Sequence, residues 1–233
     1  MRKYFAFFFL LFFPFLGYCQ EEIFLRDFLP MAKKGDYVVT SRNKNYTVLT
    51  IKDKILNSLV IEEITICENR FTRTISSWKT WVEQGAPHHT GWVSYIVELP
   101  SGKVQDHYSY THKSWYKIDE ENNLFTTLLN LKFAEIPLSE RKRSNRSHWQ
   151  PKMVVNGTPI PNVPFIPYRT LWPKDGTEIA GKTVEIYLPQ ENALYPSYFP
   201  YFMQISGTIG KAYIRIIDSG SNLFSPQQLV LKK

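Results

Sequence analysis

Short runs rich in β-branched and aromatic residues, separated by turn-forming residues, constrain the fold of this chain more than any other feature. Residues 35–41 and 46–51 flank a polar stretch that contains Asn, which predicts a β-hairpin. Residues 59–67, rich in Ile, Val and Thr, predict a third strand. Further runs of this kind are residues 92–99, 103–110, 183–188, 201–206 and 211–217. The helix–strand alternation of a parallel sheet is absent, so we expect an antiparallel arrangement.

Three segments have the pattern of short helices. Residues 77–85 begin after a serine that can act as N-cap and end at a glycine. Residues 123–131 place Leu124, Leu128 and Leu131 on one face. Residues 21–29 also favour a short helix, which Pro30 would end. The predicted fold class is therefore α+β and β-rich, with one or more antiparallel twisted sheets, a few short helices and a long Pro-rich loop.

The chain changes character near residue 140. Residues 20–140 carry most of the predicted strands and helices, and we expect them to form an antiparallel sheet lobe. Residues 141–175 form a basic and Pro-rich connection, in which residues 151–173 contain six prolines and little periodicity. Residues 176–233 supply C-terminal strands, which we expect to complete the same domain.

The first nineteen residues have the pattern of a secretory signal peptide. Arg2 and Lys3 precede an apolar run of about 13 residues, shorter than the roughly 20 that span a bilayer. The small residues Gly17 and Cys19 predict cleavage between Cys19 and Gln20. We therefore expect an exported protein of the periplasm or outer envelope, or a secreted one. An uncleaved membrane anchor is the alternative.

Residues 16–19 also resemble a bacterial lipobox, in which Cys19 would carry the lipid. Contact with a membrane is expected only through the signal peptide or through a lipidated Cys19. After cleavage Cys67 is the one remaining cysteine, so no disulfide can form within the chain. Its apolar neighbours predict a buried strand thiol.

Charge and composition exclude several classes of protein. The net charge of +7 falls to +5 when Arg2 and Lys3 are removed, which is too mild a bias to indicate nucleic acid. The basic residues at 141–146 are interpreted as a solvated loop. His107 and His112 have a spacing that places them on opposite faces of a continuous strand, and no zinc-binding quartet is present. We expect no metal and no cofactor.

Two short motifs match catalytic patterns without their structural context. Residues 176–183 match the phosphate-binding P-loop, but a β-branched run follows where that loop needs a helix. Residues 218–220, Asp-Ser-Gly, resemble the catalytic element of aspartic proteases, but those enzymes need two such carboxylates. Both are interpreted as turns next to strands.

Aromatic and histidine side chains gather in one part of the sequence. Trp78 and Trp81 are three residues apart and share a helix face, and His88, His89 and Trp92 follow closely. Aromatic residues with polar tips suit a ligand-binding surface. The five residues are therefore the predicted ligand-binding site. The alternative is that they form the core of the sheet.

Residues 35–40, 78–95 and 199–220 resemble uncharacterised exported envelope proteins of chlamydia-like bacteria. This resemblance implies a Gram-negative type of envelope and carries no activity with it. A looser architectural similarity is to periplasmic half-barrel proteins that carry lipoproteins.

The leading functional hypothesis is a non-enzymatic envelope protein that binds an unidentified ligand or protein partner. One alternative is a periplasmic lipid or lipoprotein carrier, which requires an apolar groove. The other is a hydrolase whose site is assembled only in space.

Overall fold

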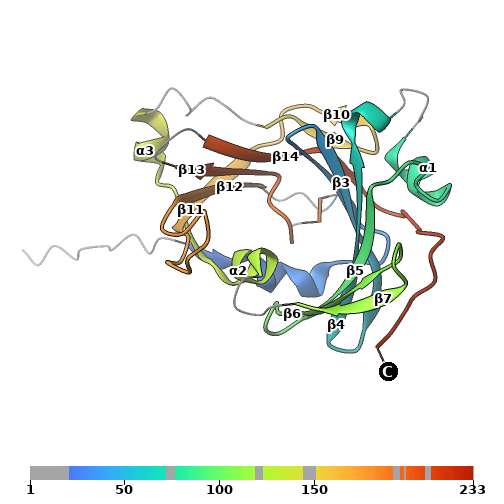
Figure 1. Cartoon of the computed structure of the whole chain (residues 1–233). Helices are drawn as coiled ribbons and strands as arrows, with labels where there is room; N and C mark the ends of the chain where they lie inside the picture. Colours follow the sequence, from blue (N-terminus) through green and yellow to red (C-terminus); the bar gives the residue numbers. More distant parts are fainter. Residues whose placement is uncertain are drawn as a thin grey trace, which may run out of the picture.

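In a computed structural model, twelve strands of the described residues pair into one antiparallel sheet (Figure 1). The structure describes residues 21–71, 77–118, 123–143, 151–190, 195–196, 198–207 and 211–232. In spatial order the strands are β1 (Glu22–Phe24), β8 (Lys132–Glu135), β11 (Phe165–Leu171), β12 (Thr183–Pro189), β13 (Phe202–Ser206), β14 (Lys211–Gly220), β2 (Tyr37–Arg42), β3 (Asn45–Ile55), β4 (Ser58–Cys67), β5 (Gly91–Glu98), β6 (Val104–Ser109) and β7 (Ser114–Lys117). The predicted β-rich, antiparallel fold class is confirmed.

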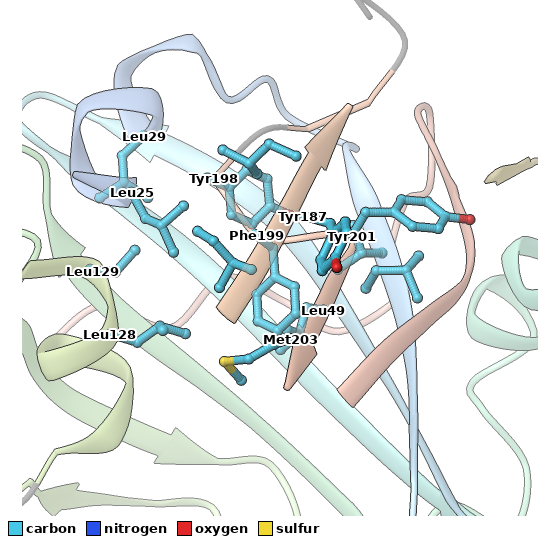
Figure 2. Close-up of a cluster of buried hydrophobic side chains, with 14 of the residues drawn as sticks. Leu25, Leu29, Leu49, Leu128, Leu129, Tyr187, Tyr198, Phe199, Tyr201 and Met203 are labelled. Atoms are coloured by element: carbon cyan, nitrogen blue, oxygen red, sulfur yellow. The ribbon is translucent and has the colours of Figure 1, made fainter. Parts of the chain in front are cut away.

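The sheet curls around its main hydrophobic core. The hollow of the curve holds the 3-10 helix η1 (Leu25–Met31) and the helix α2 (Leu124–Asn130) (Figure 1). Figure 2 shows leucines from both helices lying near Tyr198 and Phe199, which follow β12 in the chain. These side chains occupy the concave face, where a lipid carrier would need an apolar groove.

The opposite face of the sheet carries a second, smaller core. Because neighbouring strand residues point to opposite faces, Val38 belongs to the main core while Val39 belongs to the second. Val48 and Ile64 extend this second core across β3 and β4. The short helix α1 (Trp78–Glu83) covers it with Trp81, and the sheet is thus buried on both faces here.

The C-terminal residues after β14 run along this second face. Leu223 packs into the second core, and the Lys52 ammonium donates to the backbone oxygen of Gln227 at 2.6 Å. The same ammonium pairs with the fully buried Glu62 carboxylate. Tyr110 adds a hydrogen bond from its hydroxyl to the backbone oxygen of Gln228. An internal ion pair therefore fastens the end of the chain to the sheet.

Most of the predicted elements are present. Each end of these predicted strands lies within four residues of its expected position. The strands are those of the β2–β3 hairpin, β4, and the pairs β5–β6 and β13–β14. Helix α1 is capped by the Ser77 side chain, and α2 by the Asn123 side chain.

The loop interpretation of residues 151–173 is wrong. They contain the hairpin of β9 (Met153–Val155) and β10 (Thr158–Ile160), and the sheet strand β11. Pro167 pairs with Tyr187 of β12, and its backbone oxygen accepts a hydrogen bond from Ile136, just past the end of β8. The missing N–H of Pro167 lies on that same side of β11, where the ladder with β8 has already ended, so β11 tolerates the proline. Asn156 and Gly157 both have positive φ and form the two-residue turn of the hairpin.

Three smaller expectations also need correction. Residues 21–29 form β1 and then η1, with Pro30 inside the 3-10 helix instead of ending an α-helix. Helix α2 buries Leu128 and Leu129, whereas Leu124 is 52% exposed. Cys67 lies at the end of β4 and is only partly buried.

The described residues do not include the signal peptide, the processing residues Cys19 and Gln20, or most side chains of the basic stretch 141–146. What the sequence indicates about these segments stays a prediction. None of the helices in the described part of the chain has the length and apolar character needed to cross a membrane.

Replacement of Gly220 by alanine should destabilise the protein by about 1–3 kcal/mol, because a Cβ there would overlap the Asn156 side-chain oxygen and lie 2.8 Å from the Tyr37 ring. Urea unfolding measures the loss. Gly91→Ala is the matched control, since a Cβ at Gly91 meets no atom within 4 Å. Equal stability of the two variants would contradict the close packing at Gly220.

Replacement of Lys52 by methionine should cost about 3–5 kcal/mol of unfolding free energy, because it leaves the Glu62 carboxylate buried without its cation. The double variant Lys52→Met, Glu62→Leu should recover much of this loss in the same urea experiment. Lys34→Met removes an exposed ion pair with Asp53 and should cost less than about 1 kcal/mol. A double variant no more stable than Lys52→Met would count against the ion-pair explanation.

Candidate functional site

The pairing of β14 with β2 brings side chains from five strands into one row. The aligned partners are Tyr187 of β12, Phe202 of β13, Arg215 of β14, Ser41 of β2 and Tyr46 of β3. Directly opposed residues of antiparallel strands share a face and have neighbouring side chains. We call the β2–β14 pairing the seam, and this row crosses it.

A cleft of about 730 Å³ lies over this row and is called the seam cleft. Its lining residues are Ser41, Arg42, Asn43, Lys44, Tyr46, Glu68, Tyr187, Phe202, Gln204, Lys211, Ala212, Tyr213 and Arg215. Two kinds of side chain stand out among them. One is a group of four cations, and the other is a group of aromatic rings.

The aromatic rings form the apolar part of the cleft. Tyr187 and Phe202 are each 8% exposed and contact each other edge to face, with ring centroids 5.6 Å apart. Tyr213, which is half exposed, contacts Phe202 at 5.7 Å. The strand alternation of Lys211, Tyr213 and Arg215 places all three side chains on this face.

The charges around these rings are mostly positive. Arg42, Lys44, Lys211 and Arg215 are exposed, and Glu68 is the one acidic residue in the lining. Glu68 accepts a hydrogen bond from the Tyr46 hydroxyl at 3.3 Å. Burial and then the Glu68 charge raise the pKa of Tyr46, while the nearby Arg215 cation partly opposes this rise. The seam cleft can therefore attract an anion and cover an aromatic or apolar group.

A second pocket, of about 300 Å³, lies farther along β14. It is lined by Phe71, Ser77, Trp78, Val154, Asn156, Gly157, Ile217 and Asp218, and we call it the Asp218 pocket. A β-bulge between Ile216 and Asp218 shifts the register of β14 against β2. Because of this extra residue, Asp218 pairs with Val39 of the second core, although simple alternation would place it with Ile216 in the main core.

The Asp218 carboxylate fixes the β9–β10 turn to the seam. It accepts backbone hydrogen bonds from Gly157 and Ser219, both at 2.9 Å, and a longer one from the Tyr37 hydroxyl at 3.4 Å. Burial raises the pKa of Asp218, and the two backbone donors partly offset that rise. The Asp-Ser-Gly motif therefore has a structural role here at the end of β14.

The five residues of the predicted ligand site do not share one surface. Trp81 and Trp92 are 0% and 1% exposed and belong to the second core. Trp78 is partly buried and lines the Asp218 pocket. His89 contacts the Trp92 ring and a backbone oxygen, and His88 is exposed. A ligand contact by any of the five stays a prediction, and Trp78 alone among them lines one of the two pockets.

The remaining motifs are also placed by the structure. Residues 177–181 form a turn before β12, so no helix follows the P-loop-like sequence. His107 on β6 and His112 in the following turn both contact the Tyr116 ring. Among the described residues, no group of three or more His, Cys, Asp or Glu is placed to hold a metal.

Sequence reasoning missed the cationic residues of the seam cleft. The one local signal was the alternation of Lys211, Tyr213 and Arg215 within a strand that was itself predicted. It also missed the Asn156–Gly157 hairpin, although an Asn-Gly pair between β-rich residues is a strong hairpin signal.

Comparison with known proteins gives a family likeness and a fold. A family model described as CT021 protein matches residues 47–161. No curated protein matches the sequence. A solved structure of the hypothetical protein CT021 from Chlamydia trachomatis has a TM-score of 0.68 and 17% identity, and the match covers 91% of this chain and 99% of that one. This chain is therefore similar to an uncharacterised chlamydial family, the CT021 proteins, and has the fold of that hypothetical protein.

Proposed function

We propose that this protein is an exported, non-enzymatic binding protein of the cell envelope, and that it takes an anionic ligand with an aromatic or apolar portion in the seam cleft. The observation that carries the proposal is that four exposed cations and the buried rings of Tyr187 and Phe202 line the same cleft. The volume of the seam cleft lies within the usual 300–1,000 Å³ of small-molecule sites. Export is supported by the signal-peptide pattern of residues 1–19.

The two parts of such a ligand would meet different parts of the seam cleft. Arg215 and Lys211 provide charged donors to an anion, and hydrogen bonds to charged groups contribute about 1.5–3 kcal/mol each. Tyr213 and Phe202 offer ring faces and edges for stacking. The carrier alternative gains no support from the concave face, where η1 and α2 already contribute the core leucines.

The test uses 2-naphthyl phosphate as a probe, with 2-naphthol and inorganic phosphate as its two halves, in isothermal titration calorimetry. The complete probe should bind more tightly than either half, and its affinity should fall as salt is raised. Arg215→Gln should weaken binding about tenfold or more, because one charged donor is lost.

Lys103→Gln is the matched control, because it removes the same charge from an exposed turn between β5 and β6. It should leave the affinity unchanged. Binding that is equally strong in Arg215→Gln, or naphthol binding as tight as that of the phosphate, would contradict a cationic ligand site in the seam cleft.

A further inference from the structure

We propose that the Asp218 pocket binds a small organic cation, either a protonated primary amine or a quaternary ammonium ion. This site goes beyond the anion-binding seam cleft, and the two cavities share no lining residue. The inference rests on three features that meet in one pocket. They are a buried carboxylate without a cationic partner, a stacked aromatic pair, and open volume beside both.

The carboxylate is held by neutral donors. Asp218 is 3% exposed and accepts its hydrogen bonds from two backbone N–H groups and the Tyr37 hydroxyl. Among the described residues, no Lys, Arg or His forms an ion pair with it. This contrasts with the buried Glu62, whose charge is matched by Lys52. A buried carboxylate without a counter-charge is costly, and a cation in the adjoining pocket would offset that cost.

The aromatic pair supplies a wall suited to a cation. The Phe71 and Trp78 rings are stacked, with centroids 4.3 Å apart and planes 22° from parallel. Tyr46 contacts both rings edge to face and helps to hold them. A cation within about 6 Å of such a ring is attracted by its π electrons, most strongly by tryptophan.

The pocket chemistry favours an organic cation over a metal ion. Divalent cations such as Ca²⁺ take six or more oxygen ligands, whereas Asp218 is the one carboxylate in the lining. The volume of about 300 Å³ also exceeds what a bare ion needs, since one water occupies about 30 Å³ of liquid. A methylated or primary amine can contact the carboxylate and the rings together.

The test titrates tetramethylammonium chloride into the protein and follows saturation-transfer NMR from the protein to the methyl protons of the probe. Sodium chloride at equal ionic strength is the competitor control. We expect saturable transfer that sodium chloride does not abolish. Asp218→Asn should weaken binding at least tenfold, because the amide oxygen can still accept the backbone hydrogen bonds while the charge is lost. Trp78→Leu should weaken it in the same way.

Arg215→Gln is the control that separates the two cavities, because it alters the seam cleft and should leave tetramethylammonium binding unchanged. If circular dichroism shows that Asp218→Asn does not fold, Trp78→Leu decides the question. The proposal is overturned if a folded Asp218→Asn or Trp78→Leu variant binds tetramethylammonium as tightly as the unmodified protein. It is also overturned if sodium chloride abolishes the saturation transfer. Methyl glucoside serves as a neutral probe for a sugar site. If it binds, its binding survives Asp218→Asn and tetramethylammonium does not bind, the proposal is overturned in favour of a sugar site.

Discussion

The pairing of β14 with β2 is the contact on which the rest of the structure depends. It joins the β11–β14 strands to the β2–β7 strands, and the Tyr37–Asp218 hydrogen bond across it links residues 181 positions apart. Such a long-range contact must overcome the entropy of closing a long loop, so it needs support from both faces of the sheet. The main core provides this support on one face, and the second core with the C-terminal residues provides it on the other.

Both candidate sites depend on this seam. The seam cleft takes Tyr46 from one side of it and Phe202 from the other, and the Asp218 pocket likewise combines Trp78 with residues of β14. The β-bulge after Ile216 decides which face Asp218 joins. One strand therefore presents Arg215 to a cationic cleft and, three residues later, Asp218 to a pocket with an acidic group.

The sequence predicted the elements whose signals are local. Alternation and turn residues predicted the β2–β3 hairpin, a serine N-cap and a terminal glycine predicted α1, and the leucine spacing predicted α2. It failed where prolines suggested a loop, because β11 tolerates Pro167 only through the particular end of its ladder with β8. The predicted ligand site, which includes Trp81 and Trp92, was chosen because aromatic and histidine residues are concentrated in that part of the sequence. Local sequence does not show that Trp81 and Trp92 are covered by neighbouring elements.

By itself the sequence determined strand-forming segments, their antiparallel character and the positions of two short helices, since these follow from periodicity and from contacts within a few residues. Tertiary structure alone decided the order of the strands, the face on which each aromatic ring is buried, and the meeting of Arg215 with Tyr46 or of Asp218 with Trp78. The physical reason is that burial and charge pairing depend on which distant strands become neighbours, and that choice is made by the packing of both faces of the sheet together.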